Sequence, residues 1–346
     1  MNERPERPAR LAIVGAGLVG RTHARHAQNE ANLVAIADPA NEARKFAGKL
    51  QVAHFNTLQD LLANKAIDGA VIATPNQMHR EHALACIRAG IAVLVEKPLA
   101  DTVEAAAEIV AAGKDYNVPV LVGHHRRHNP VIKKAKQIAG TGQLGRLASA
   151  HCSCWLYKPD DYFNASWRRQ PGAGPVYINL IHDVDLLLHL CGPVVSVQAM
   201  ESNNVRKHEV EDTATILLRF ASGALATMSV SDTIAAPWSW ELSSGENPVY
   251  PHMKTTNTML GGTRASLSIP DLGLWRHEGK PDWWNPMNRV QVKVRPADPL
   301  VLQMRHFARV ALGLEDPLVP GRDGLAALKV IEAIKQAAST HSLVSL

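Results

Sequence analysis

Short apolar runs alternate with amphipathic stretches through the first third of the 346-residue chain. Each run has the length of a buried strand and each stretch between runs favours a helix, an alternation typical of a parallel sheet in an α/β protein. We predict helices at residues 18–29, from 39 to about 50, and at 57–64, 77–89 and 101–115. The predicted strands lie at residues 11–14, 33–37, 52–55, 69–73, 91–95 and 118–122.

The remainder of the chain changes to a period-two pattern, which is typical of antiparallel strands with one covered face. A long loop is predicted over residues 237–259, and a loop of that length is uncommon unless it serves a site or an interface. Further helices are predicted at residues 130–140, 176–190, 299–312 and 324–338. Strands are predicted at residues 146–155, 194–200, 213–220, 224–231, 261–269, 274–277 and 289–294.

The first apolar run ends in three glycines, Gly15, Gly17 and Gly20, with the spacing G-x-G-x-x-G. In a strand-turn-helix unit the first glycine permits a sharp turn, the second lets the backbone approach a pyrophosphate, and the third lets helix and strand pack closely. Leu18 and Val19 begin the helix, whose N-terminal amides favour an anionic group. Ordinary glycine-containing turns show the same spacing, so other residues have to show whether this turn binds a dinucleotide.

An acidic residue is the first of these. Asp38 ends the second apolar run, 18 residues after Gly20. A carboxylate near this position accepts hydrogen bonds from ribose hydroxyls and repels a 2′-phosphate, which favours NAD over NADP. Arg44 lies close enough in sequence to keep NADP use open, and a solvated turn residue before Pro39 is the alternative explanation of Asp38.

Polar residues follow two later strands. The triplet Thr74-Pro75-Asn76 comes after one strand and Glu96-Lys97-Pro98 after the next, at the carboxyl ends where open α/β sheets bind ligands. The alternative for Glu96 and Lys97 is that they only pair with each other at the surface. The run from Gly123 to Pro130 leads out of this sheet and is either a solvated connector or part of a substrate cleft.

These motifs together resemble the Gfo/Idh/MocA oxidoreductase family, and the E-K-P triplet is the most distinctive of them. The resemblance implies a Rossmann NAD-binding domain over residues 1–124. It also implies a substrate-binding and oligomerisation α/β domain over 125–346, with a large open, mostly antiparallel sheet and last helices that can pack back on the first domain. The cofactor-binding candidates are Gly15, Gly17, Leu18, Val19, Gly20, Asp38, Thr74, Pro75, Asn76, His79, Glu96 and Lys97.

The same resemblance implies a catalytic pair, because the family uses a histidine from a helix after a glycine-rich turn together with the E-K-P lysine. In this chain the pair is Lys97 and His182. Relatives often have an aspartate four residues before the histidine, where this chain has Ile178. Asn179 is our substitute, since residues three apart share a helical face. A histidine on an apolar helix is otherwise most often a core residue.

We predict that arginines, one asparagine and one tryptophan select the substrate. Arginine binds carboxylate or phosphate through two parallel hydrogen bonds, and tryptophan covers a sugar ring. The candidates are Arg126, Arg127, Asn129, Trp167 and Arg168.

Composition narrows the class of protein. Hydrophobic residues make up 46% and charged residues 20%, without a membrane-spanning apolar run. The formal charge of +5 is spread without a basic block, so no nucleic-acid partner is expected. The four cysteines lack C-x-x-C spacing, so we expect reduced thiols and no metal site. The first ten residues are charged and proline-rich, from which we expect a cytoplasmic protein with a disordered N-terminal tip.

We therefore expect an NAD-dependent oxidoreductase that transfers a hydride between nicotinamide and a secondary hydroxyl or keto group of a sugar, polyol or related small molecule. Two alternatives stay open. Some relatives of the family hydrolyse glycosidic bonds with no net redox change, and a third class would be a non-catalytic dinucleotide-sensing protein. A homodimer or homotetramer is expected, because an open sheet has one face to bury.

Overall fold

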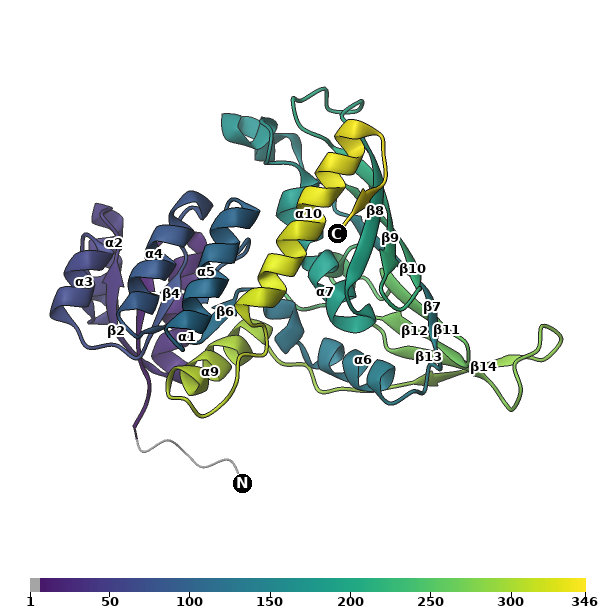
Figure 1. Cartoon of the computed structure of the whole chain (residues 1–346), viewed down its shortest axis with the longest axis horizontal. Coiled ribbons are helices and arrows are strands. Elements are labelled where there is room, and N and C mark those ends of the chain that lie inside the picture. The colour runs from purple at the N-terminus through teal and green to yellow at the C-terminus, as the bar shows by residue number, and fades with distance from the viewer. Residues whose placement is uncertain (1–6) are drawn as a thin grey trace. The chain divides into compact units, whose positions relative to one another are not determined.

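The computed structural model of the chain describes residues 7–346 and divides them into two compact units. The first unit comprises the described residues up to His128 together with Pro299–Leu328. The second comprises Asn129–Asp298 and Lys329–Leu346. Figure 1 shows the elements of each.

The expected disordered tip is corrected for the part that is described. Arg7 and Arg10 both bind Asp68, with Arg7 Nη1 2.6 Å from Oδ2 and the Arg10 backbone N–H donating to Oδ2 at 2.8 Å. Residues 7–10 are therefore ordered, because two cations and one carboxylate fix the entry into the first strand. Residues 1–6 of the expected tip lie outside the described residues.

The first unit contains a six-stranded parallel sheet in the order β3-β2-β1-β4-β5-β6, which confirms the predicted doubly wound α/β sheet. The strands are β1 (Arg10–Val14), β2 (Asn32–Ala37), β3 (Ala53–Phe55), β4 (Gly69–Ile72), β5 (Ala92–Val95) and β6 (Val120–Val122). The helices are α1 (Leu18–Glu30), α2 (Asn41–Leu50), α3 (Leu58–Asn64), α4 (Asn76–Arg88), α5 (Val103–Asp115), the 3₁₀ turn η1 (His125–His128) and α9 (Pro299–Ala311).

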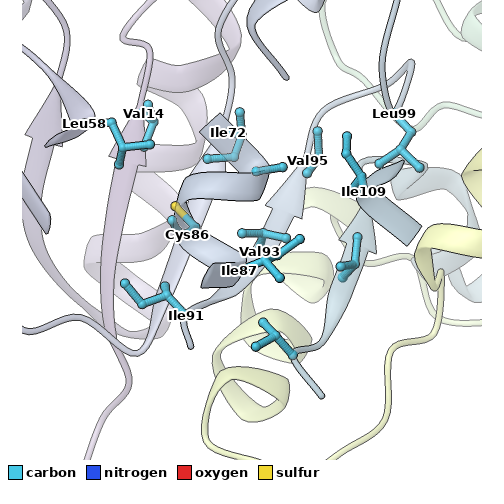
Figure 2. Packing of buried hydrophobic residues seen from close by; sticks show 14 of the residues in the cluster. Val14, Leu58, Ile72, Cys86, Ile87, Ile91, Val93, Val95, Leu99 and Ile109 are labelled. Atoms are coloured by element: carbon cyan, nitrogen blue, oxygen red, sulfur yellow. The ribbon is translucent and has the colours of Figure 1, made fainter. Parts of the chain in front are cut away.

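Both faces of this sheet are buried. Alternate strand residues contribute to two apolar clusters, so Val14, Ile72 and Val95 belong to one cluster while Ile13 and Leu94 belong to the other. Figure 2 shows the first cluster, in which Cys86 and Ile87 of α4 lie close to β4 and β5. Burial on both faces explains the continuous apolar runs seen in the sequence. It also leaves the carboxyl ends of the strands as the places where polar side chains collect.

The second unit contains a nine-stranded, mostly antiparallel sheet in the order β14-β13-β12-β11-β7-β10-β9-β8-β15. The strands are β7 (Leu147–Trp155), β8 (Val194–Ser202), β9 (Thr213–Phe220), β10 (Leu225–Ser231), β11 (Thr258–Gly262), β12 (Ala265–Ile269), β13 (Gly273–His277), β14 (Met287–Gln291) and β15 (Val344–Ser345). The helical elements are α6 (Pro130–Gly140), η2 (Asp160–Asn164), η3 (Ser166–Arg169), η4 (Val176–Leu180), α7 (Ile181–Cys191) and α8 (Trp240–Ser243), and α10 (Gly321–Thr340) begins in the first unit and ends in this one.

The expected large, mostly antiparallel sheet is confirmed, with β10 antiparallel to β9 and parallel to β7. Two expectations about this unit are corrected. Residues 261–269 form the end of β11 and all of β12 rather than one strand, since the chain turns back at Thr263 and Arg264. The predicted helix 176–190 begins with a π-helical turn, η4, and becomes an α-helix at Ile181.

Within residues 7–346, no helix combines the length and the apolar character needed to cross a membrane.

Candidate active site

In the turn between β1 and α1, two of the three glycines have no room for a side chain. Gly15 has φ +90°, and a Cβ added there would lie 2.7 Å from the carbonyl oxygen of Ala73. A Cβ on Gly20 would lie 1.9 Å from the carbonyl oxygen of Gly15, so this position has no room for a side chain. Gly17 differs, because a Cβ there would meet no described atom within 4 Å. The turn therefore presents open backbone at Gly17, next to the N-terminus of α1, where an anionic group is favoured.

A cavity of about 750 Å³ lies against this turn and against the ends of β2 and β4. Its size is within the range of cofactor sites. The predicted residues that line it are Gly15, Gly17, Leu18, Val19, Asp38, Thr74 and Pro75. Sequence reasoning missed Asn56, Thr57, Met78, Glu81 and His82, which also line it. Asn56 and Thr57 directly follow β3, so the rule that ligands bind at strand ends was a signal that could have found them.

Asp38 is fixed at the edge of this cavity by two backbone amides. Its Oδ2 accepts a hydrogen bond from the N–H of Ala16 at 2.7 Å, and its Oδ1 accepts one from the N–H of Ala40 at 2.8 Å. Each carboxylate oxygen keeps a second lone pair for a ligand. The open backbone at Gly17 and the fixed carboxylate of Asp38 fit the pyrophosphate and ribose of a dinucleotide.

His79 lies between two strand-end loops. Its side chain is buried, with Nε2 2.9 Å from the carbonyl oxygen of Thr74 and Nδ1 2.9 Å from that of Pro98. Burial lowers the pKa of His79, against the opposing effect of the two carbonyls. This geometry connects the loops after β4 and β5. Asn76 is the first residue of α4.

The Glu96-Lys97-Pro98 triplet follows β5 and is tied to helix α1. Glu96 Oε1 lies 2.7 Å from Nε2 of His23, a buried residue that sequence reasoning missed. Glu96 Oε2 accepts a hydrogen bond from the backbone N–H of Lys97 at 3.1 Å. Glu96 is thus built into the end of the sheet, and its carboxylate has a partner 73 residues away in the sequence.

The predicted substrate-binding residues have structural contacts of their own. Arg126 and Arg127 lie buried in η1, and Arg127 Nη1 is 2.5 Å from Asp323 Oδ2. Asn129 caps α6 by accepting a hydrogen bond from the N–H of Val131 at 2.9 Å, and its Nδ2 donates to Glu246. These residues belong to different units, so their joint role in substrate binding stays a prediction.

The 3₁₀ turn η3 carries the other two substrate candidates. Arg168 lies over the ring of Tyr162 at 4.1 Å and donates to the Tyr162 carbonyl at 2.7 Å, so part of its hydrogen-bonding capacity is used inside the loop. Trp167 is 54% exposed and offers an aromatic face to solvent. Trp167 is therefore the better placed of the two for contact with a sugar ring.

The π-helical turn η4 and helix α7 carry the catalytic candidates of the second unit. His182 is buried in the first turn of α7. Asn179 lies in η4, and its Oδ1 is buried without a hydrogen-bond partner among residues 7–346. A π turn closes its hydrogen bonds over five residues, so the three-residue spacing of an α-helix does not by itself place Asn179 and His182 on one face. Asn179 stays a candidate on other grounds, since no described residue uses the hydrogen-bonding capacity of its buried amide oxygen.

A buried carboxylate anchors the start of this turn. Glu211 Oε1 accepts a hydrogen bond from the N–H of Val176 at 3.2 Å, and only a glycine at 174 leaves room for it, because a Cβ there would lie 2.1 Å from Oε1. Lys335 of α10 lies 2.7 Å from both Glu211 and Glu201. Burial by itself would lower the pKa of Lys335, but these two carboxylates raise it above its ordinary value. No sequence pattern pointed to this network.

A doubly wound sheet with a glycine turn, an acidic residue after β2 and a Glu-Lys pair after β5, joined to a unit with a large open sheet, is the architecture of a dinucleotide-dependent oxidoreductase. Comparison with known proteins identifies the family. Residues 9–124 match the model described as "Oxidoreductase family, NAD-binding Rossmann fold", and residues 132–250 match the GFO/IDH/MocA C-terminal domain. The chain belongs to the GFO/IDH/MocA family of NAD(P)-dependent oxidoreductases, which confirms the resemblance, the class of enzyme and the NAD-binding domain.

Among its relatives, 1,5-anhydro-D-fructose reductase of Ensifer adhaerens is 27% identical over 287 residues, covering 82% of this chain and 81% of that protein. Inositol 2-dehydrogenase 4 of Saccharopolyspora erythraea is 31% identical over 240 residues, covering 65% and 67%. The crystal structure of the WlbA dehydrogenase from Bordetella pertussis in complex with NADH and UDP-GlcNAcA superimposes with a TM-score of 0.78 at 26% identity, covering 98% of this chain and 99% of that one.

Proposed function

We propose that this chain oxidises a secondary hydroxyl of a sugar, polyol or related compound with NAD, or reduces the corresponding ketone. The observation that carries the proposal is the first unit's combination of a dinucleotide-sized cavity at Gly17 and Asp38 with a fixed Glu96-Lys97 pair after β5. Relatives named as an anhydrofructose reductase and an inositol dehydrogenase support this class of substrate.

The proposed proton chemistry uses two basic side chains. NAD, when bound, supplies the hydride acceptor. The hydroxyl proton also has to leave, so the reaction needs a general base with a pKa near the working pH, and neutral His182 is the proposed base. Lys97 as an ammonium stabilises the negative charge that develops on the substrate oxygen. Asn179, with its buried amide oxygen, is proposed to accept a hydrogen bond from the substrate or from His182.

Asp38 supports NAD over NADP. Both of its oxygens are oriented by backbone amides, so the carboxylate cannot turn away from a ribose without breaking those bonds. A 2′-phosphate at the same place would meet a fixed like charge. Arg126, Arg127, Asn129, Trp167 and Arg168 stay the proposed substrate-binding residues, and residues 1–124 and 125–346 stay the proposed functional domains.

We also propose a homodimer or homotetramer that forms through the open sheet. The strand registers place exposed apolar residues on one face, namely Leu217, Leu225, Met259 and Trp275. Such a face is stabilised by burial against another surface. Light scattering on the purified protein tests this, since a monomer across the working concentration range would contradict it. The four free cysteines support the proposed cytoplasmic location, because reduced thiols suit a reducing compartment.

Calorimetric titration with NAD and NADP, followed by an absorbance screen for NADH on polyols, aldoses and sugar acids, tests the proposed function. We expect tighter binding of NAD than of NADP and substrate-dependent formation of NADH. Binding of NAD with glycoside cleavage and no net reduction would favour the redox-neutral hydrolase instead. Binding without any turnover would favour a dinucleotide sensor, and no binding of either nucleotide would contradict the assignment of the cavity.

A further inference from the structure

His23 is a buried histidine on the helix that follows the glycine turn. It stands three residues after Gly20 in α1, and 1% of its side chain is exposed. Because an ionised carboxylate only accepts hydrogen bonds, Nε2 of His23 carries the hydrogen that it shares with Glu96 Oε1 at 2.7 Å. Its Nδ1 is buried without a hydrogen-bond partner in residues 7–346. Within that part of the chain, Glu96 is therefore the one polar partner of the ring.

The Glu96 carboxylate is enclosed from three directions. His23 contacts Oε1, the backbone N–H of Lys97 contacts Oε2, and a Cβ on Gly123 would lie 2.9 Å from Oε2. The side chain of Glu96 keeps 15% exposure. Burial by itself would raise the pKa of Glu96, but the hydrogen bond and charge of His23, with further help from Lys97 and His125, bring it down to about 2. Glu96 is thus an anion at any pH at which the proposed reaction would run.

We propose that His23 is a positioning residue, which holds the Glu96 carboxylate and through it the backbone of Lys97 at the end of β5. This inference rests on the proposed function of Lys97. The contact joins α1, whose residues Leu18 and Val19 line the dinucleotide cavity, to Glu96, the chain neighbour of the lysine proposed to stabilise the substrate oxygen. A shift of about 1 Å in a reacting group lowers rates by about a hundredfold, so a fixed starting point for the long lysine side chain matters for the rate.

The test compares three variants. In H23L the ring is replaced by an apolar side chain that cannot donate, whereas in H23Q the amide nitrogen takes the place of Nε2 and keeps a donor. The matched control is H306L, because His306 forms a similar pair with Glu315, at 2.8 Å from Nδ1 to Oε2, in the same unit. Thermal unfolding of all three measures how much each change destabilises the fold.

Two readouts follow. Hydrogen exchange at the backbone amide of Lys97 reports the contact directly and needs no substrate, and we expect exchange about tenfold faster in H23L and near wild type in H23Q. Steady-state kinetics report its consequence. We expect kcat in H23L to fall about 10- to 100-fold while KM for the alcohol and the calorimetric Kd for NAD change less than threefold, with most of kcat restored in H23Q.

The outcomes separate the two claims. A wild-type protein that binds NAD but oxidises no substrate would remove the proposed function, while the exchange of the Lys97 amide would still show whether His23 positions that backbone. An active wild type with unchanged exchange and kcat in H23L would overturn the positioning role alone. Equal losses of kcat in H23L and H306L would mean that both variants act through general destabilisation, which would also overturn it.

Discussion

The two units hold their candidate catalytic residues in different ways. In the first, Asp38 and Glu96 directly follow strands, and each carboxylate accepts a backbone hydrogen bond, Asp38 from Ala16 at 2.7 Å and Glu96 from Lys97 at 3.1 Å. In the second, His182 follows a π-helical turn whose start depends on Glu211, a residue 35 positions away from Val176 in the sequence. The sheet edge therefore places its polar residues where strands end and orients them by backbone amides and by His23, whereas the helical site depends on a buried carboxylate that is paired with Lys335.

The largest expected effect is the loss of stability caused by a substitution in the glycine turn. G20A places a Cβ 1.9 Å from a backbone oxygen, so we expect at least about 3 kcal/mol of destabilisation or failure to fold. G17A is the matched control, because its Cβ meets no described atom. We expect G17A to unfold at a denaturant concentration close to that of wild type and to bind NAD about 10- to 100-fold more weakly. Equal stability of the two variants in urea unfolding would contradict the steric explanation.

The charged network of the second unit comes next. K335M leaves Glu201 and Glu211 without their shared cation, and we expect a loss of about 2–3 kcal/mol, less than for a fully buried pair because Lys335 keeps 25% exposure. Since the start of η4 depends on Glu211, kcat should fall while the Kd for NAD stays within threefold.

The control for this variant is K329M, which changes an exposed lysine on the same helix. We expect K329M to match wild type in both unfolding and kcat. A K335M protein with reduced stability but unchanged kcat would show that the network supports the fold without orienting the catalytic candidates.

Cofactor preference gives a smaller effect. D38S removes the fixed charge, and we expect the ratio of the Kd values for NADP and NAD to fall about 10- to 100-fold, equivalent to about 1.4–2.7 kcal/mol. Calorimetry measures both constants, and D115S, at the exposed end of α5, is the control for a change in net charge. An unchanged ratio in D38S would place the ribose elsewhere.

The smallest expected effect is the pH dependence of the stabilisation that Asp68 provides at the start of the first strand. The hydrogen bond from Arg7, assisted by Arg10 against the opposing effect of burial, holds the pKa of Asp68 well below its ordinary value of 3.8. Because the pKa is lower in the folded state, Asp68 contributes its full stabilisation above pH 3.8 and loses it progressively as the pH falls further. Unfolding curves of wild type and D68N should therefore converge on acidification below that value. Parallel curves down to the acid transition would contradict this assignment.

The same contrast explains how much of the fold and site the sequence could predict. Gly15, Gly20 and Asp38 act through local rules of turn geometry, strand ends and charge, so their pattern is visible in the chain itself. The parallel pairing of β10 with β7 could not be predicted, because alternation of apolar residues carries no information about strand direction. The π turn and its Glu211 anchor depend on contacts between residues far apart in sequence, and so does the pairing of His23 with Glu96.

The most direct test of the proposed chemistry is single-turnover formation of NADH by K97M, paired with calorimetric titration of NAD on the same protein. We expect NAD affinity within threefold of wild type and a rate of hydride transfer lower by about 100- to 1,000-fold, since the ammonium that stabilises the substrate oxygen is gone. A K97M protein that forms NADH at a rate close to wild type would contradict the role of Lys97 and, with it, the proposed active site.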